Sequence, residues 1–271
     1  MQLALAVAEL VQESVYGTPR IELEDGTYVV RFARDVEEVE AALKLRFEVF
    51  NLELGEGLDA SFQTGRDRDE FDATSHHLIV LEKAAGNVVG TYRLRTMEMA
   101  GSSEGFYSAG EFDLSCLPSL VLNAAVELGR ACISQSHRNR QVLFLLWKGL
   151  ALYAMSERKR FLFGCCSLTS QDESEGQRML DHLTRNGHMH STLFVPPRAG
   201  YECGASDSSA SSCDDSYKQM KVPRLFGTYL EIGAKVCGPP AIDREFKTID
   251  FLVMFDIKTM DAKTRRLFFT V

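Results

Sequence analysis

Two charged residues inside an apolar stretch are the first candidates for chemistry in this sequence. The segment VELGRACIS (126–134) has the apolar composition of a buried strand, yet it contains Glu127 and Arg130. A charge buried in such a strand is costly unless it is paired and hydrogen-bonded. Because strand side chains alternate, two residues three apart would face opposite sides of a regular strand. We expect a bulge at Gly129 that turns both charges toward one cleft.

A basic turn follows this strand and leads into an apolar helix. The free N–H groups at the start of a helix, together with its dipole, favour anions. From His137 to Arg160 there are six Lys or Arg and one acid, Glu157, so this segment carries +5 in a chain of net charge −8. Two interpretations remain open: solvated helix ends, or a landing patch for an acidic, phosphate-bearing partner.

The opposite charge dominates an earlier segment. Between Glu48 and Asp72 the chain has eight acids against two basic residues, Arg66 and Arg68. Such a segment is either a solvated loop or a region that attracts a cationic amine. Together, the two segments favour one anionic and one cationic substrate.

The elements that must position these residues alternate between strands and helices. We expect an α/β (α+β) fold: a mixed, mostly antiparallel central sheet with helices on both faces. A single domain is predicted over residues 27–260, with a loop at about 200–218 that we expect to be mobile. A helical N-terminal extension (1–26) precedes the domain and a C-terminal tail (261–271) follows it. Strands are predicted at 27–33, 76–97 (a hairpin), 126–134, 161–168, 189–195 and 248–257, and helices at 36–54, 142–160, 171–186 and 224–234.

Composition and missing motifs exclude several classes of protein. The net charge of −8 argues against a nucleic-acid-binding protein, and no apolar run is long enough for a membrane-spanning helix. The seven cysteines include no CxxC pair, which indicates a reducing, cytoplasmic setting without a metal site. The phosphate-loop, dinucleotide and zincin motifs are absent from the sequence.

Seven segments, in this order and spacing, resemble one family. They are RFEVFNLELGEGL, DRDEFDATSHHLIV, VVGTYRLR, VELGRACIS, LLWKGLALY, FLFGCCSL and YLEIGAKVCGPPAIDREFKTIDFLVMFDI. The chain is similar over about residues 28–258 to GNAT-like N-acyltransferases, namely the hemolysin-like ornithine N-acyltransferases of ornithine-lipid synthesis and the long-chain N-acyl amino acid synthases. It is more distantly similar to the acyl-homoserine lactone synthases. The turn SHRNRQV lacks the glycines typical of acetyl-CoA-dependent relatives.

The resemblance implies transfer of a long-chain, often 3-hydroxylated, fatty acyl group from acyl carrier protein to the α-amine of an amino acid, with ornithine as the expected acceptor. It implies no tightly bound cofactor beyond the acyl carrier protein thioester, and no metal. Glycine or tyrosine as acceptor, a carrier- or membrane-binding module with little turnover, and an acetyl-CoA-dependent enzyme remain alternatives. Peripheral contact with the membrane is a further expectation. The residues expected to bind the carrier and its phosphopantetheine are Ser134, His137, Arg138, Asn139, Arg140 and Lys148.

The resemblance also assigns catalytic roles. The amine must lose a proton before it attacks the thioester, and Glu127 is the expected base. Arg130 either holds Glu127 or binds the carboxylate of the amino acid. Tyr153 is the expected proton donor to the departing thiolate, with core packing as the alternative.

Further charged residues have two interpretations. The positions expected to form the acceptor site, or instead an ion-pair network that pins the 55–75 loop, are Arg46, Asp69, Asp72 and Arg93. Residues of lower weight are His76 and His77, the thiols Cys165 and Cys166, the acids Asp243 and Asp250, and Trp147 as a border of the acyl tunnel.

Overall fold

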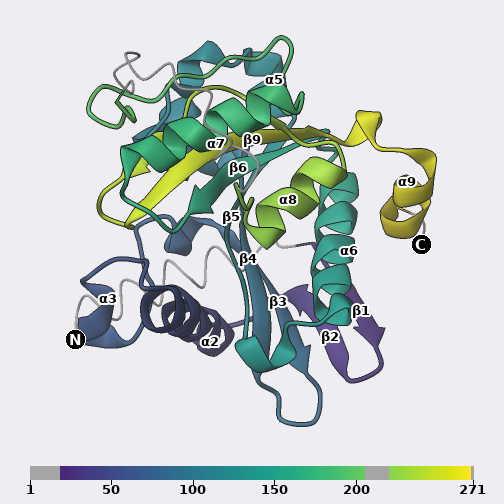
Figure 1. Ribbon diagram of the computed structural model, residues 1–271. Helices are drawn as coiled ribbons and strands as arrows, with labels where there is room; N and C mark the ends of the chain where they lie inside the picture. The colour runs from purple at the N-terminus through teal and green to yellow at the C-terminus, as the bar shows by residue number, and fades with distance from the viewer. Residues whose placement is uncertain (1–18, 205–219, 270–271) are drawn as a thin grey trace.

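A single nine-stranded sheet organises the molecule (Figure 1). The computed structural model describes residues 19–204 and 220–269. The sheet order is β1-β2-β3-β4-β5-β6-β9-β7, with β8 also paired to β9, and β5 with β6 is the parallel pair within the described strands. The strands are β1 (Glu22–Asp25), β2 (Tyr28–Phe32), β3 (His76–Glu82), β4 (Val88–Thr96), β5 (Ala125–Ile133), β6 (Phe161–Leu168), β7 (Lys235–Val236), β8 (Ala241–Asp243) and β9 (Thr248–Asp256).

Helices cover both faces of this sheet. They are α2 (Val36–Phe47), which continues into a π-helical segment (Glu48–Leu54), and α3 (Ser61–Thr64), α4 (Met97–Ala100), α5 (Ser119–Asn123), α6 (Arg140–Ser156), α7 (Glu173–Arg185), α8 (Arg224–Glu231) and α9 (Ala262–Phe269). Side chains cap α2 and α6 at their start: Asp35 accepts from the Glu38 N–H at α2, and Asn139 accepts from the Val142 N–H at α6.

The first half of the sheet is sandwiched between α2 and α6. The apolar side of α6, including Leu145 and Leu146, packs on Leu78 and Val80 of β3. On the opposite face, α2 packs Ala42 and Leu43 against Ile79 and Leu81 of the same strand. Because β3 is buried on both faces, it has a continuous apolar sequence rather than an alternating one.

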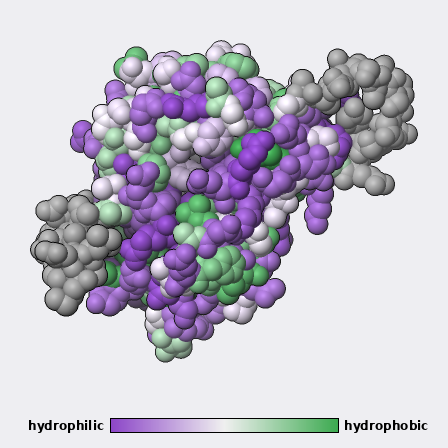
Figure 2. All heavy atoms as spheres, turned by 90° about the vertical axis from the view of Figure 1, so that its left-hand side faces the viewer, coloured by the Kyte–Doolittle hydropathy of each residue, from purple (hydrophilic) through white to green (hydrophobic). Residues whose placement is uncertain are grey.

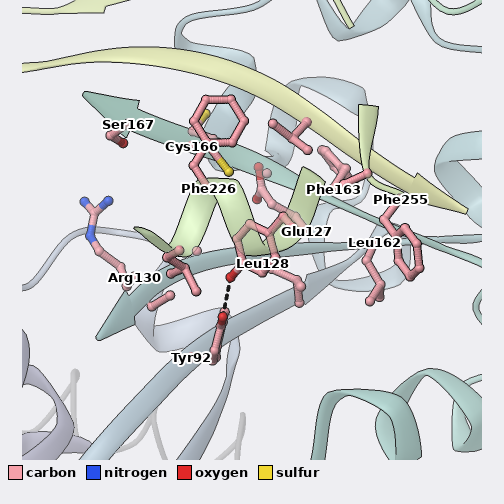
Figure 3. Close-up of a pocket in the computed structure, with 18 of the residues that line it drawn as sticks. Tyr92, Glu127, Leu128, Arg130, Leu162, Phe163, Cys166, Ser167, Phe226 and Phe255 are labelled. Carbon is pink, nitrogen blue, oxygen red and sulfur yellow. Dashed lines mark hydrogen bonds between the residues drawn. The ribbon is translucent and has the colours of Figure 1, made fainter. Parts of the chain in front are cut away.

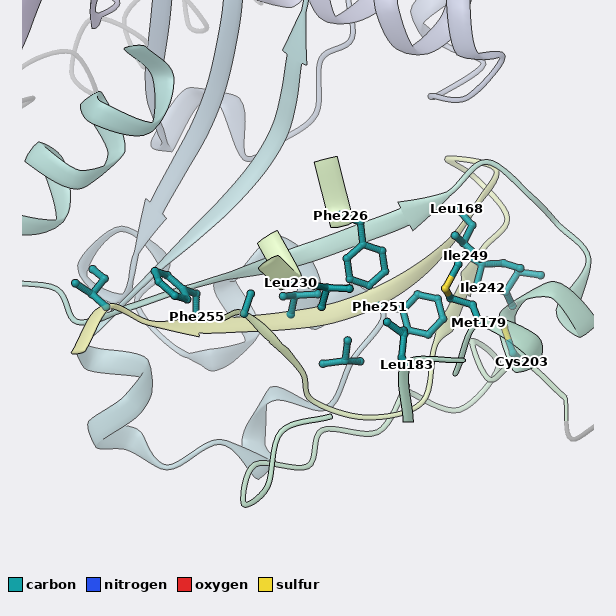
Figure 4. Packing of buried hydrophobic residues seen from close by; sticks show 14 of the residues in the cluster. Leu168, Met179, Leu183, Cys203, Phe226, Leu230, Ile242, Ile249, Phe251 and Phe255 are labelled. Atoms are coloured by element: carbon teal, nitrogen blue, oxygen red, sulfur yellow. The ribbon is translucent and has the colours of Figure 1, made fainter. Parts of the chain in front are cut away.

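The second half of the sheet, β6 with β9, has its own core. Met179 and Leu183 of α7 and Phe226 and Leu230 of α8 pack on Phe251 of β9 (Figure 4). This layer lies on the same side of the sheet as α6, as Figure 1 shows. The other side is covered by the segment that connects β4 to β5, which buries Phe106, Phe112 and Leu122 in a separate cluster.

The predicted fold class is confirmed, and three predicted boundaries differ from the structure. Residues 189–195 form a single bridge, Met189 with Val236, instead of a strand. β1 falls inside the segment predicted to be an extension, and α9 inside the predicted tail, where Phe268 packs on Trp147. Most of the N-terminal helix and of the 200–218 loop lie outside the described residues. Within the described part of the chain, no helix combines the length and apolarity needed to span a bilayer.

Candidate active site

The site begins where two parallel strands part. β5 and β6 are paired from Ala125–Phe161 to Glu127–Phe163, and the pairing ends there. Gly164 sits at this fork, where a Cβ atom would lie 2.2 Å from the carbonyl oxygen of Leu128. A side chain at residue 164 would therefore push the strands apart, and glycine is what lets the backbones meet.

A bulge on β5 changes the direction of the strand just beyond the fork. Against β4, Thr91 pairs with Cys132 and Arg93 with Gly129, so two residues of β5 oppose Tyr92 alone. The predicted bulge is present, but the residue with positive φ is Arg130 (φ 51°) and not Gly129. A Cβ at Gly129 would lie 4.0 Å from the guanidinium of Arg93, an ordinary contact distance, so neither φ nor crowding requires a glycine there.

A cavity of about 390 Å³ occupies the fork (Figure 3). This volume lies within the usual range for small-molecule sites. The cavity is lined by residues from both faces of the sheet: Leu128 and Leu162 on the side of α6, and Glu127 and Phe163 on the other. In Figure 3, Arg130 and Ser167 lie at the end where β5 and β6 diverge.

One arm of the cavity is apolar. It runs between α6 and α8, and its walls are Trp147, Leu150, Ala151, Leu162, Leu225, Phe226, Phe255 and Phe268. A pair of hydroxyls interrupts it, since Tyr92 and Tyr229 hydrogen-bond to each other, and burial raises the pKa of Tyr92 to about 12. This arm fits an aliphatic chain, and Trp147 borders it as expected.

Glu127 faces the cavity with most of its acceptor sites filled. Its Oε1 accepts from the Ser108 N–H (2.8 Å) and hydroxyl (2.6 Å), and its Oε2 accepts from the Tyr107 N–H (2.9 Å). A carboxylate has about four lone-pair directions, so one on Oε2 is left for a substrate or water. The two charges of VELGRACIS thus face one cavity, but Arg130 is bound by other carboxylates.

Those carboxylates belong to a closed ring of six buried charges. Going round, Arg46 pairs with Asp72, Asp72 with Arg93, Arg93 with Asp69, Asp69 with Arg130, Arg130 with Asp67, and Asp67 with Arg46, at 2.5 to 3.1 Å. Each of these side chains is at most 12% exposed. The ring ties the 67–72 segment to α2, β4 and β5, which is the structural alternative stated for these residues.

The ring determines the protonation of its members. Burial would raise the pKa of Asp72, but the guanidinium groups of Arg46 and Arg93 outweigh it and hold the pKa far below its usual range. The pKa of Asp67 is lowered for the same reason, by Arg46 and Arg130 against burial. These carboxylates are therefore ionised at neutral pH and already paired, which leaves them poorly suited to bind an incoming ammonium.

Arg130 belongs to both the ring and the cavity. Its guanidinium lies between two rings, 4.6 Å from the centroid of Tyr107 and 4.3 Å from that of Phe246. Positive φ costs a non-glycine residue roughly 1–3 kcal/mol. The ion pairs with Asp67 and Asp69 and the two aromatic contacts hold Arg130 in this conformation.

Tyr153 is not at the cavity, which corrects the role predicted for it. Its side chain is fully buried on α6 against Phe32, and its hydroxyl bonds to Nδ1 of His76 at 2.9 Å. His77 bonds to the carbonyl oxygen of Asp72 at 3.0 Å. These residues are buried core groups, which for Tyr153 is the alternative stated, and Nδ1 of His77 has no hydrogen-bond partner within the described residues.

The expected basic patch is divided in two. α6 has 17 residues, so its ends lie about 26 Å apart, and Arg158, Lys159 and Arg160 are at the end far from the turn. Lys159 and Arg160 pair with Glu98 and Asp256. The +5 counted along the sequence is therefore not one landing patch.

The residues expected to bind the carrier remain around the start of α6, with one exception. Asn139 caps the helix, His137 bonds to the Tyr28 hydroxyl at 3.0 Å, and Arg138 pairs with Glu53. The N–H groups of Arg140 and Gln141 precede the first helical hydrogen bond, from Leu143 to Asn139. Ser134 directly follows β5 beside this turn, whereas Lys148 lies eight residues along the helix, about 12 Å from Arg140.

The thiols are unsuited to covalent catalysis. Burial raises the pKa of Cys165 well above its ordinary value, and it also raises that of Cys166. A nucleophilic cysteine needs the thiolate form. The six described cysteines are free.

Sequence reasoning missed several residues at the far end of the cavity. Glu56 and Asp250 line it, and Glu111 lies behind Asp250. Asp250 was only a minor candidate, although it interrupts the apolar strand TIDFLVMFDI just as Glu127 interrupts β5. No sequence signal distinguishes Glu56 from its acidic neighbours.

Known proteins resemble this chain in sequence and in fold. A family model described as an acetyltransferase (GNAT) domain matches residues 45–148. The "L-ornithine N(alpha)-acyltransferase" of Brucella abortus is 32% identical over 254 residues, covering 88% of this chain and 87% of that protein. The protein of the same name from Rhodobacter capsulatus is 30% identical over 248 residues, covering 89% and 95%. The solved acyl-homoserine lactone synthase LasI overlaps with a TM-score of 0.48 at 12% identity, covering 90% of this chain and 96% of that one.

A forked GNAT-like sheet around a cavity with one apolar and one polar end defines the class, an acyltransferase. Within that class, the chain belongs to the family of the L-ornithine N(alpha)-acyltransferases.

Proposed function

We propose that this protein transfers a long-chain fatty acyl group from the thioester of acyl carrier protein to the α-amine of ornithine. The observation that supports this most is the cavity itself, which joins an apolar arm to an acidic end across the fork. An acyl chain fits the first, and a cationic amino acid fits the second. The names of its relatives agree with this acceptor.

In this proposal the thioester lies at the fork. Beyond Glu127 the backbone of β5 is no longer paired with β6, so its N–H groups are available for the thioester oxygen. Such preorganised donors stabilise the negative charge that develops on the oxygen in the transition state. The acyl chain then extends between α6 and α8.

Glu127 is the proposed acceptor of the proton that the α-ammonium loses, directly or through one water. It lies at the fork, and the remaining lone pair of Oε2 is enough for one hydrogen bond. Arg130 is the proposed partner of the amino acid carboxylate. Of its two predicted roles, this one agrees better with a guanidinium that lines the cavity and is not bound to Glu127.

The carrier is proposed to dock at the start of α6. The first-turn N–H groups, with His137 and Arg140 beside them, favour binding of the phosphate of phosphopantetheine. From there the pantetheine arm would extend along β5 to the fork. Cytoplasmic location and contact with the membrane face belong to this proposal as well. Figure 2 shows apolar patches among hydrophilic atoms on one face of the molecule, and three exposed apolar residues lie on the π-helical segment and α3: Leu52, Leu54 and Phe62.

The test supplies purified protein with a long-chain acyl carrier protein thioester and a panel of amines, and detects products by mass spectrometry. We expect N-acyl ornithine, more of it than N-acyl glycine or N-acyl tyrosine, and less product when acetyl-CoA replaces the carrier thioester. Absence of N-acyl product with every amine would refute the proposal. Carrier binding without product would instead favour a binding module.

A further inference from the structure

The acidic end of the cavity contains two carboxyl groups to which the proposed reaction gives no role. Asp250 of β9 and Glu56 both line the cavity and are 3% and 6% exposed. Oδ1 of Asp250 has no hydrogen-bond partner within the described residues. A buried polar atom left without a partner costs roughly 1–3 kcal/mol, so one that faces a cavity indicates a missing ligand.

The surroundings of Asp250 indicate a cationic ligand. Burial, together with the Asp243 carboxylate, raises the pKa of Asp250. Burial and the Asp250 carboxylate likewise raise that of Glu56. A cation between the two would relieve their repulsion and favour the ionised form of both.

An organic ammonium fits this wall better than a metal ion. Glu111, Cys165 and Asp250 have potential metal-ligating atoms within 4.8 Å of one another. Burial raises the pKa of Glu111 and of the Cys165 thiol well above their ordinary values, which favours the protonated form of both groups. A metal ion at this wall would need Glu111 and Cys165 in their deprotonated forms. An ammonium needs neither group, because Asp250 and Glu56 can accept its hydrogen bonds.

The position of Asp250 along the sheet selects which ammonium it can reach. Asp250 pairs with Ser167, three residues beyond Gly164, so it lies about 10 Å from the fork along β6. Five single bonds separate the two nitrogens of ornithine, a span of roughly 6 Å. With about 3 Å for attack at the fork and about 3 Å for the ion pair, the side-chain ammonium reaches Asp250 and the attacking amine does not.

We propose that Asp250, assisted by Glu56, binds the side-chain ammonium of the acceptor and so selects a diamino acid over a neutral amino acid of the same length. This inference rests on the proposed function, because the acceptor must present its α-amine at the fork. It assigns specificity to residues that take no part in the proton transfer.

The test measures equilibrium binding without any acyl donor. Ornithine and norvaline, which lacks only the side-chain amine, are titrated calorimetrically into the wild type and three variants: Asp250→Asn, Glu56→Gln and Asp59→Asn. The last is a matched control, because Asp59 belongs to the same acidic segment but its side chain is 82% exposed. We expect Asp250→Asn to weaken ornithine binding about 30-fold or more and to leave norvaline unchanged. Glu56→Gln should have a smaller effect in the same direction, and Asp59→Asn almost none.

Equal weakening of both ligands, or of neither, overturns the inference. Thermal melting checks that Asp250→Asn folds. If that variant does not fold, the ornithine-to-norvaline ratio of Glu56→Gln decides the outcome, and an unchanged ratio overturns the inference.

A parallel assay of acyl transfer separates this inference from the proposed function. If the wild type binds ornithine through Asp250 but forms no N-acyl product, the proposed function fails and the binding site stands. If it acylates ornithine while Asp250→Asn keeps the wild-type ratio of kcat/KM for ornithine over norvaline, the function stands and the specificity site fails.

Discussion

Replacing Arg46 by methionine tests the ring of buried charges most directly. The Arg46 side chain is 1% exposed and contacts two carboxylates, Asp67 at 2.7 Å and Asp72 at 2.6 Å. Methionine has a similar length but cannot donate, so it leaves three aspartates with two arginines. Asp67 and Asp72 each keep one arginine partner and Asp69 keeps two, yet the buried ring acquires one uncompensated negative charge.

The expected cost follows from that uncompensated charge. Removing one partner of a buried ion pair costs about 3–5 kcal/mol. With a urea m value of about 3 kcal/mol/M for a chain of this size, the midpoint of unfolding falls by about 1 M or more. Arg34→Met provides the control, because its pair with Glu22 is 60% and 45% exposed and contributes about 0–1 kcal/mol.

The pH dependence gives a second readout of the same ring. The folded-state pKa values of Asp67 and Asp72 are lowered, so their contribution to stability is present above the unfolded value of about 4 and is lost as pH falls below it. In Arg46→Met one carboxyl group can take up a proton, which removes the uncompensated charge. The difference in free energy of unfolding between this variant and the wild type should therefore narrow as pH falls from 7 toward 4. Urea titrations at several pH values measure both effects. A loss no larger than that of Arg34→Met, with no dependence on pH, would refute this account of the ring.

Four further predictions concern the fork and the core. Gly164→Ala should lower the stability by about 1–3 kcal/mol and remove most of the activity, because its Cβ would lie 2.2 Å from the Leu128 carbonyl oxygen. Gly110→Ala is the control in melting and product assays, since a Cβ at that position has no atom within 4 Å. Equal losses of stability and activity in the two variants would contradict the fork. Glu127→Gln should lower kcat by about 100-fold with little change in KM, and an unchanged kcat would remove Glu127 as proton acceptor. Tyr153→Phe should keep full activity and lose about 1 kcal/mol through the His76 bond, whereas a large loss of kcat would restore Tyr153 as the proton donor. Burial lowers the pKa of His76 to about 4, so the folded protein loses roughly 3 kcal/mol of stability as pH falls from 6.5 to 4. His76→Gln should flatten this part of the curve of stability against pH, measured by urea titrations. An unaltered curve would show that another group titrates there.

The sequence by itself determined the sheet, the order of its elements and the position of the fork. Local patterns sufficed because β3 and β9 are buried on both faces and β6 is buried or half-buried along its length, and continuous apolar runs mark such strands clearly. The charges of VELGRACIS marked the site for the same reason, since Glu127 and Arg130 are costly in an apolar strand unless the fold compensates them.

Only the tertiary structure decided which charges meet. Arg46, Arg93 and Arg130 come from α2, β4 and β5, and ring closure through the 67–72 segment depends on long-range distances that no spacing encodes. The same limit explains the two corrected predictions. The hydroxyl of Tyr153 meets a histidine 77 residues away, and helix length separates basic residues that are neighbours along the chain. Charge and composition are properties of the sequence, whereas pairing and exposure depend on distances that exist only after folding.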